Sequence, residues 1–449
     1  MMKIIMMLIS LMIIKNSFKN MNKNLHNMLI LIMFNMIMFN DIKMNLFNYM
    51  FNNYCIDNNS FMMVLLTLWI FSFSLLSNFN FFYNMNKIKF INLILFMMNS
   101  MIMFFMSMNL LMFFIYFESS LIPIIMLIFG WGNQIDRIQA SMYMLLYTLF
   151  GSMPLLIMII FLYKNMNSCL INFIYLLNKS LLINFNLLTF LAMNLAFLIK
   201  MPMYFLHLWL PKAHVESPIS GSMILAGIML KLGSFGMMRF IYMFMYMYNK
   251  FNLIFMIMSI WGSIMCCLIC MNINDLKIII AYSSIIHMGA MLTNLMIMFK
   301  YSFFSSIMMM FAHGLCSPLM FYTSFIMYKR SKSRNIYFNK GIINVLPNLS
   351  MWWFLITICN MSSPPSLNLI SEFFIMMNLI KYSLYFIMIN LLLIFFSSLY
   401  NIYFFYSTQN KMWNLMNFNF NQMNFKETLI LKINWMILNL MFFNIYLMT

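Results

Sequence analysis

Residues 194–218 read NLAFLIKMPMYFLHLWLPKAHVESP, and this stretch decides how the fold is interpreted. It begins as an apolar run, yet Lys200 lies inside that run and Pro202 follows two residues later. Proline removes a helix hydrogen bond and its ring clashes with an earlier carbonyl, so a helix through this segment is expected to break. Ionisable side chains then crowd the rest of the stretch: His207, Lys212, His214 and Glu216. Their meaning depends on whether the segment lies in a membrane.

The composition of the whole chain answers that question. Of its 449 residues, 64% are hydrophobic and only 8% are charged, whereas soluble domains carry about 25% charged residues. A soluble protein built this way would expose very large apolar patches. We therefore expect an all-α polytopic membrane protein, whose length suggests about a dozen or more transmembrane helices of about 20 residues each.

The formal net charge of +18 would suggest a nucleic-acid partner for a soluble protein. Here the basic residues lie between apolar runs. The largest group lacks the interleaved aromatic residues that stack on bases, and consists of Lys329, Arg330, Lys332, Arg334 and Lys340. We therefore expect lipids, and no nucleic acid, around this chain.

Residue usage indicates which genome encodes the chain. The sequence holds 62 Met and 51 Phe but only 11 Gly, and Ile, Asn, Lys and Tyr are also abundant. These residue types are favoured by A/T-rich codons, and heavy use of Met is typical of a genetic code that assigns extra codons to it. This usage indicates an insect-like mitochondrial genome.

Apolar runs predict where the chain crosses the membrane. We expect spans at roughly residues 4–14, 25–40, 61–78, 89–109, 110–130, 140–163, 187–209, 218–246, 252–272, 276–297, 301–328, 352–381, 383–407 and 428–447. The links after odd-numbered spans carry more Lys and Arg than the links after even-numbered spans. We therefore expect the odd-side links to face the matrix.

Four ionisable residues lie well inside predicted spans: Glu118, Lys200, Lys231 and Glu372. A charge at the bilayer centre costs about 3 kcal/mol on insertion scales, so such residues face a bundle interior or a water-filled cavity. Glu118 lies about eight residues into its span, or roughly 12 Å along the helix, which is close to mid-depth. Their opposite signs suggest that Glu118 and Lys200 share a cavity. Mutual attraction favours the charged forms of the two side chains and desolvation favours the neutral forms, so both residues could exchange protons.

A second break is predicted at Pro364-Pro365, as at Pro202. Groups freed at such breaks must be satisfied by protein or water, so broken spans mark cavities. If residues 89–246 and 252–407 are five-helix repeats, broken span seven pairs with broken span twelve, and the odd number of helices makes the repeats inverted. The remaining N- and C-terminal transmembrane helices would then fill residues 1–88 and 408–449.

The histidines leave two interpretations open. His287 and His313 lie inside predicted spans beside serines, and are either satisfied core residues or members of a proton relay. His207 and His214 are seven residues apart, and zinc would need further ligands at shorter spacing, so we expect no metal site. The seven cysteines include one CxxC motif without a second pair. The sequence also lacks GxGxxG and Walker A motifs, so no cofactor is expected on this chain.

Longer motifs then identify a family. They are FESSLIP (117–123), WGNQ (131–134), KMPMYFLHLWLPKAHVESPI (200–219), GSM (221–223), LKLG (230–233), DLK (275–277), AYSSIIHM (281–288), AHGL (312–315) and NMSSPPSLNL (360–369) followed by Glu372. From about residue 85 onward the chain resembles the subunit 4 family of mitochondrial NADH–ubiquinone oxidoreductase, or respiratory complex I. One departure is Ser371, where the family usually has glycine. This antiporter-like family is similar to subunits of multisubunit cation/proton antiporters.

The resemblance implies a fold and residue roles. The fold would have fourteen spans and two inverted five-helix repeats, with spans seven and twelve broken. Glu118 and Lys200 would form the charged pair of the first half-channel. Lys231 would be the central relay, and Glu372 would lead to the far side.

The resemblance also implies that His287 and His313 lie along the polar axis between those residues. The chain would be a core membrane-arm subunit of respiratory complex I in the mitochondrial inner membrane, translocating protons while NADH reduces ubiquinone. It would carry no redox centre, and NADH, flavin, iron–sulfur clusters and ubiquinone would bind elsewhere in the complex. Its partners would be other membrane-arm subunits, including neighbouring antiporter-like subunits, and lipids. Two alternatives remain open: a cation/proton antiporter subunit and a structural scaffold of the membrane arm.

Overall fold

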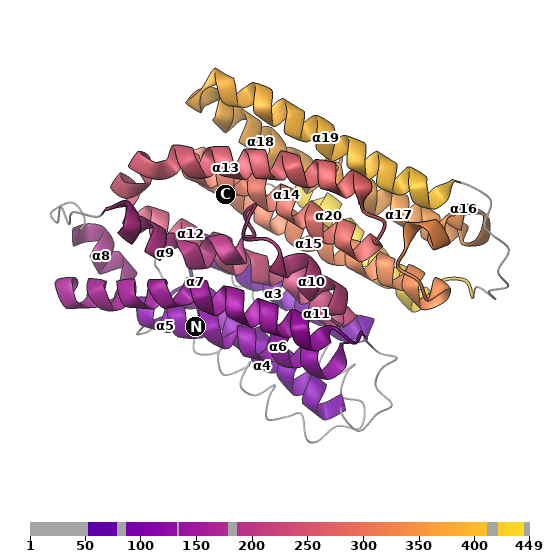
Figure 1. The fold of residues 1–449 in the computed structure, drawn as a ribbon, viewed down its shortest axis with the longest axis horizontal. Helices are drawn as coiled ribbons and strands as arrows, with labels where there is room; N and C mark the ends of the chain where they lie inside the picture. The colour runs from indigo at the N-terminus through magenta and orange to yellow at the C-terminus, as the bar shows by residue number, and fades with distance from the viewer. Residues whose placement is uncertain (1–52, 79–86, 133, 178–185, 411–420, 444–449) are drawn as a thin grey trace. The chain divides into compact units, whose positions relative to one another are not determined.

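The structure is a computed structural model that describes residues 53–78, 87–132, 134–177, 186–410 and 421–443. Within these ranges the chain is helical and forms no strand beyond three isolated bridges (Figure 1). The predicted all-α fold class is therefore confirmed. The two spans predicted within residues 4–40 lie outside the described residues.

In the described ranges, nine helices are long and apolar enough to cross a membrane. They are Asn58–Ser77, Ile88–Met106, Leu110–Trp131, Arg137–Met166, Ile219–Met243, Met245–Asn272, Leu276–Ile297, Lys300–Ser331 and Leu384–Gln409. A tenth is counted if Ile336–Val345 and Pro347–Asn360, which are bent by 116° at their junction, form one broken span. The chain is thus a multi-pass membrane protein, while the total of fourteen spans and the two inverted repeats stay predictions.

The chain divides into two compact units whose segments alternate along the sequence. The first unit consists of Met1–Lys200, Glu216–Ile224 and Lys231–Asn249. The second unit consists of Met201–Val215, Leu225–Leu230 and Lys250–Thr449. The boundaries expected for the repeats, at 89–246 and 252–407, stay predictions.

The first unit contains α3 (Asn58–Ser77), α4 (Lys87–Met106), α5 (Leu110–Ser119), α6 (Leu121–Trp131), α7 (Arg137–Met166), α8 (Ile171–Leu177), α9 (Leu187–Lys200), α11 (Ile219–Ile224) and most of α12 (Leu230–Met243). At the N-terminal ends of two of its helices, side chains accept hydrogen bonds from free backbone N–H groups. At α3, the Ser60 hydroxyl accepts from the backbone N–H of Asp57. At α5, the Asn109 side chain accepts from the backbone N–H of Leu111.

The span predicted as one helix over residues 110–130 is divided at Ser120, between α5 and α6. The hydroxyl of Ser120 donates to the Phe117 carbonyl at 2.9 Å, in competition with the helix ladder. Pro123 has no N–H to offer the carbonyl of Ser119 four residues earlier. Both effects loosen the helix directly after Glu118, so this residue lies at a helix end.

Close packing in the first unit brings α9 against α7 and α12. A Cβ atom added to Gly151 of α7 would lie 2.6 Å from the Ile199 side chain, so glycine permits this approach. A Cβ atom on Gly236 of α12 would overlap the ring of Phe197. The Phe197 ring is itself packed against other buried rings, including Phe240 at 5.0 Å between centroids. The end of α9 is therefore held rigidly.

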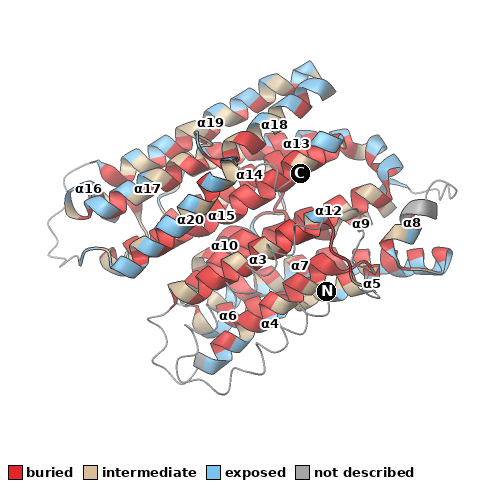
Figure 2. Ribbon diagram, turned by 180° about the vertical axis from the view of Figure 1, so that it is seen from behind, coloured by how far each residue is buried: buried red, intermediate tan, exposed pale blue. Residues whose placement is uncertain are grey.

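The second unit contains most of α10 (Trp209–Glu216), the π-helix η4 (Leu225–Met229), most of α13 (Met245–Asn272), α14 (Leu276–Ile297), α15 (Lys300–Ser331), the 3-10 helix η5 (Ile336–Asn339), α16 (Ile342–Val345), α17 (Pro347–Asn360), α18 (Leu367–Tyr382), α19 (Leu384–Gln409) and α20 (Phe425–Phe443). Helices α14, α15 and α18 pack against one another. Figure 2 shows α15 buried along nearly its whole length, whereas α19 exposes one face. The centre of the second unit is thus built around α15.

The chain leaves the helical conformation at the predicted place between residues 361 and 366. α17 ends at Asn360 and α18 begins at Leu367. Two consecutive prolines, Pro364 and Pro365, lack the N–H groups that would continue the helix ladder. The Asn360 side chain instead donates to Asn401 of α19 at 2.9 Å. The break is therefore stabilised by buried amide groups.

Candidate functional site

Lys200 is the last residue of α9, and only 2% of it is exposed. Its ammonium Nζ donates to the carbonyl oxygen of Phe117 at 2.7 Å and lies 3.1 Å from the centroid of the Phe117 ring. Cations are attracted both to the negative C-terminal end of a helix and to an aromatic face. The end of α5 therefore holds the Lys200 ammonium through its backbone and through one ring.

Glu118 follows Phe117 in the last turn of α5. Its carboxylate feels the charge of Lys200 and a hydrogen bond with Ser152 of α7. Its Oε1 atom is buried with no hydrogen-bond partner in the described part of the chain. Among the described residues, no ion pair within 4.0 Å joins Glu118 to Lys200. The two residues predicted to pair are therefore neighbours, but the lysine is bonded to the adjacent carbonyl.

This arrangement has a direct chemical consequence. A buried carboxylate oxygen without a donor costs free energy. Either a proton or the ammonium of Lys200 would satisfy Oε1 of Glu118. The first change neutralises the carboxylate, and the second requires Lys200 to leave the Phe117 carbonyl. A proton relay uses both kinds of change, namely protonation of a carboxylate and movement of a charged side chain between two partners.

Lys231 also belongs to the first unit and is completely buried, with 0% of it exposed. It lies in the first turn of α12, directly after the π-helix η4. Within the span predicted over residues 218–246, the helical geometry therefore changes from π to α at Leu230, one residue before Lys231. Such π-helical turns occur frequently at functional sites. The depth of Lys231 in the membrane stays a prediction.

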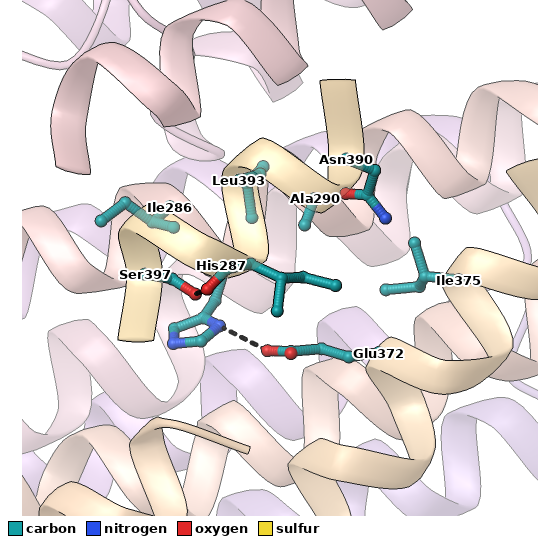
Figure 3. Close-up of a pocket in the computed structure, with 9 residues that line it drawn as sticks. Ile286, His287, Ala290, Glu372, Ile375, Asn390, Leu393 and Ser397 are labelled. Carbon is teal, nitrogen blue, oxygen red and sulfur yellow. Dashed lines mark hydrogen bonds and ion pairs between the residues drawn. The ribbon is translucent and has the colours of Figure 1, made fainter. Parts of the chain in front are cut away.

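The carboxylate of Glu372 in α18 faces His287 of α14 in the second unit (Figure 3). Glu372 Oε1 lies 3.4 Å from His287 Nδ1. The hydroxyl of Ser362, in the break between α17 and α18, donates to the other carboxylate oxygen, Oε2, at 2.5 Å. The break thus supplies one donor to Glu372, and α14 supplies a titratable group.

His313 of α15 continues this arrangement. The ring centroids of His287 and His313 are 5.7 Å apart, and the two residues are 3% and 1% exposed. The Nε2 atom of His287 is buried without a hydrogen-bond partner among the described residues. Glu372, His287 and His313 therefore form a series of neighbouring titratable groups on three helices, which we call the Glu–His series. Each member can hold or release a proton.

A small cavity adjoins the Glu–His series. It is lined by His287, Glu372, Ala290, Asn390 and Ser397, among others (Figure 3). Its volume of about 10 Å³ is close to what a single water molecule requires. A water in this position would have polar partners on α14, α18 and α19, so the cavity is suited to hydration.

Comparison with known proteins places this geometry in a family. The family model described as "NADH:quinone oxidoreductase/Mrp antiporter, TM" matches residues 107–397, nearly two thirds of the chain. The chain belongs to this NADH:quinone oxidoreductase/Mrp antiporter family. The matched segment contains all six residues that the sequence singled out: Glu118, Lys200, Lys231, His287, His313 and Glu372.

Relatives within the NADH:quinone oxidoreductase/Mrp antiporter family are named NADH-ubiquinone oxidoreductase chain 4. The protein from Ceratitis capitata is 44% identical over 388 residues, which are 86% of this chain and 85% of the relative. The protein from Aedes aegypti is 46% identical over 331 residues, covering 73% and 72% of the two chains. A chain of "Respiratory complex I from Thermus thermophilus with bound NADH" superposes with a TM-score of 0.84, at 19% identity and with 98% and 94% coverage. The likeness to this bacterial structure establishes the shared fold.

The structure assigns the six residues to two separate groups. Glu118, Lys200 and Lys231 belong to the first unit, whereas His287, His313 and Glu372 belong to the second. His207 and His214 take other positions in the second unit. His207 stacks on Tyr204 with ring centroids 5.3 Å apart, and His214 stacks on Phe321 at 4.6 Å. These two histidines pack against rings, as expected for core residues.

Two contacts in this family member were not predicted from the sequence. The Phe117 carbonyl is a backbone group, and only the pairing of distant helices reveals that it binds Lys200. The sequence places Ser362 only in the predicted break, although two serines ahead of two prolines could have indicated a hydroxyl near Glu372. Ser362 has a φ of 56°, a left-handed conformation that few residues adopt. This backbone turn is what directs its hydroxyl to the carboxylate.

Proposed function

We propose that this chain is a proton-translocating membrane-arm subunit of an NADH–ubiquinone oxidoreductase. Membership of the family, the name shared by the chain 4 relatives and the coverage of both chains support this function. The observation that carries it is the Glu–His series. Buried titratable groups are costly in an apolar bundle and mark proton pathways there. In the Glu–His series, His287 lies beside both Glu372, at 3.4 Å, and His313, at 5.7 Å between ring centroids, so neighbouring titratable groups follow one another through the second unit.

The proposal includes a location and partners. The chain would lie in the mitochondrial inner membrane, among lipids and other membrane-arm subunits, including neighbouring antiporter-like subunits. NADH, flavin, iron–sulfur clusters and ubiquinone would bind to other parts of the complex, so redox energy would reach this chain as a change of charge or shape at its surface. The fourteen spans and the inverted repeats over residues 89–246 and 252–407 are part of the same proposal.

The six residues have distinct proposed roles. A charge change in a neighbouring subunit would disturb Glu118 and Lys200. Lys200 would then leave the Phe117 carbonyl, and Lys231 would change its protonation. A proton would leave by way of Glu372. The contact of Lys200 with a carbonyl beside Glu118, instead of with the carboxylate itself, supports a lysine that has two alternative partners.

In the second unit, His287 and His313 would carry the proton to or from Glu372. The 3.4 Å separation between Glu372 Oε1 and His287 Nδ1 is close to hydrogen-bonding distance, and a small shift or one water would allow transfer. The one-water cavity beside this pair offers the second route. The hydroxyl of Ser362 would keep the carboxylate turned toward His287.

Removal of two charges of the candidate site tests the proposal. Lys231→Ala and Glu118→Ala should abolish quinone reduction that is coupled to proton pumping. Both variants should leave intact the oxidation of NADH by artificial acceptors, which needs only the peripheral part of the complex. Lys164→Ala is a matched control, because Lys164 is an exposed lysine in the last turn of α7. Full coupled turnover of both the Lys231→Ala and Glu118→Ala variants would refute the assignment.

Two other functions give different results. A sodium or potassium/proton antiporter, favoured by the antiporter part of the family description, would show a proton flux in proteoliposomes that depends on the cation. Replacing sodium and potassium by choline would then stop the flux, whereas the proposed function predicts no change. A structural scaffold would lose assembly, visible on a native gel, when Lys231 or Glu118 is neutralised, and would keep coupling in whatever complex still assembles.

A further inference from the structure

A buried polar cluster in the second unit lies outside the Glu–His series. Asn294 of α14 donates from Nδ2 to two groups of α15, the Ser302 carbonyl at 2.7 Å and the Ser305 hydroxyl at 2.6 Å. Asn378 of α18 donates from Nδ2 to Asn294 Oδ1 at 3.0 Å and to Ser305 Oγ at 3.1 Å. Asn294, Ser302 and Ser305 are 0% exposed and Asn378 is 2% exposed. We call these four residues the amide cluster.

The amide cluster joins the same three helices that carry the Glu–His series. Asn294 shares α14 with His287, Ser305 shares α15 with His313, and Asn378 shares α18 with Glu372. On each helix the two positions are separated by about two turns, or roughly 9 to 12 Å. The three helices are therefore joined at two positions along their length. The amide cluster joins them at one position, and the Glu–His series lies about two turns away.

The cavity described above lies beside the Glu–His series and extends toward the amide cluster. Ala290 and Ile375 line it, and each lies one turn beyond its series member on α14 or α18. Side chains that line a cavity have no packing partners on the side that faces the cavity. Packing contacts at this position therefore do not fix the spacing of the surrounding helices. The direct side-chain hydrogen bonds of the amide cluster supply a constraint that packing does not supply at the cavity.

The amide cluster is not arranged to conduct protons. Both N–H groups of the Asn294 amide are committed to α15, and both N–H groups of Asn378 are committed to Asn294 and Ser305. The Ser305 hydroxyl donates to the Tyr301 carbonyl at 2.9 Å. Amide groups do not exchange protons readily. The Ser305 hydroxyl accepts from both amides, and its own proton is donated to a backbone carbonyl. The arrangement suits a fixed connection.

We propose that the amide cluster is a positioning element that sets the distances between Glu372, His287 and His313. By fixing α14, α15 and α18 relative to one another, it keeps the His287 imidazole within reach of both the carboxylate and the second imidazole. Asn294, Ser305 and Asn378 are thus positioning residues that act through the Glu–His series. The inference rests on the proposed proton-translocating function, because the distances have a use only if protons pass along the series.

Sequence alone gives little sign of this role. Asn294 and Asn378 are 84 residues apart, and each lies in a mainly apolar part of its helix. A buried asparagine in an apolar helix must find partners, which is a general hint of a contact between helices. The sequence does not reveal that the partners are one another, or that the helices they join carry Glu372, His287 and His313.

The test uses the assembled complex in inner-membrane vesicles, with rates normalised to the amount of complex on a native gel. Asn378→Leu preserves the approximate volume and removes two donors. Ser305→Ala removes the hydroxyl that accepts from both amides. Displacement of a reacting group by about 1 Å lowers rates by about a hundredfold at the extreme, and we expect a loss of about tenfold in coupled quinone reduction. The yield of protons per NADH should fall as well, while NADH oxidation by a peripheral acceptor stays unchanged.

Two matched variants isolate the hydroxyl of Ser305. Ser306→Ala removes a neighbouring hydroxyl that is equally buried and donates only within α15, to the Phe303 carbonyl at 2.6 Å. Ser305→Thr keeps the hydroxyl in place. Both should pump normally, so that loss with Ser305→Ala and rescue with Ser305→Thr would support the positioning role. If Asn378→Leu fails to assemble, Ser305→Ala decides the question.

Normal coupled rates and proton yields in assembled Asn378→Leu and Ser305→Ala complexes would overturn the inference. A loss that only follows the amount of assembled complex would overturn it too, because that result indicates a purely structural role. Glu372→Gln, measured in parallel, separates this failure from failure of the proposed function. If Glu372→Gln loses pumping and the cluster variants do not, only the positioning role is wrong. If Glu372→Gln also pumps normally, the proposed function is wrong.

Discussion

The contact between Glu372 and His287 leads to a prediction about coupling between the two residues. Because Oε1 of Glu372 lies 3.4 Å from Nδ1 of His287, a proton passing along the Glu–His series has to pass through both. Residues that act as one unit have strongly non-additive effects. Glu372→Gln and His287→Gln should therefore each lower the coupled rate, and the double variant should be no slower than the slower single variant.

The magnitude follows from the geometry. Opposite unit charges 3.4 Å apart attract by about 5 kcal/mol at an effective dielectric constant of 20, which is a ceiling for this pair when the histidine carries a proton. Coupling energies measured for residues in contact are lower, about 0.5 to 3 kcal/mol. Positioned proton transfer contributes about a hundredfold or more to a rate. We therefore expect each single variant to lose about a hundredfold, and the coupling energy to reach about 3 kcal/mol.

The assay is NADH-driven quinone reduction in inner-membrane vesicles, measured for the four members of the cycle and normalised to assembled complex. Ser324→Ala is a suitable control, since Ser324 is buried in α15 and donates only to the Phe321 carbonyl. Additive losses, with the double variant about ten-thousandfold slower than the unmodified complex, would contradict a shared proton path. They would indicate that Glu372 and His287 act independently.

Three further predictions concern the stability of the fold. Arg239→Met removes the cation from the ion pair with Asp57, and leaving that carboxylate buried and unpaired should destabilise the first unit by about 3 kcal/mol, measured as a lower melting temperature of the isolated complex. Glu427→Gln breaks the ion pairs of α20 with two basic residues of α15, and should make the C-terminal segment more sensitive to limited proteolysis. Gly236→Ala should cost about 1 to 3 kcal/mol, because the new methyl group would overlap the enclosed ring of Phe197; an unchanged melting temperature would show that the ring can move.

Sequence reasoning predicted the helical fold class and the burial of Lys200 and Lys231, whereas Glu118 and Glu372 are only half-buried. Apolar runs predict transmembrane helices because lipid offers the backbone no other partners. The burial of Lys200 and Lys231, at 2% and 0% exposure, follows from their depth in those runs. The break between α17 and α18 follows from two adjacent prolines. Proline lacks the backbone N–H that a helix needs, and its position is visible in the sequence itself.

Other features depended on contacts that no local pattern contains. The division of the helix after Glu118 had a visible signal in Pro123, but its exact position at Ser120 depends on hydroxyl groups that compete for carbonyls. The π-helix before Lys231 has no evident sequence signal. The contact of Lys200 with the Phe117 carbonyl joins residues 83 positions apart. Such contacts arise from how the helices pack, which hydrophobic periodicity does not determine.

The central claim is that buried titratable groups of this chain carry protons across the membrane. The most direct test is the number of protons translocated per NADH oxidised by the assembled complex in sealed vesicles, measured with the Lys231→Met variant. Methionine has a similar shape and no charge, so packing around this fully buried position is largely retained. We predict that the ratio of protons to NADH falls in this variant while NADH oxidation by a peripheral acceptor continues. An unchanged ratio in a fully assembled Lys231→Met complex would contradict the claim.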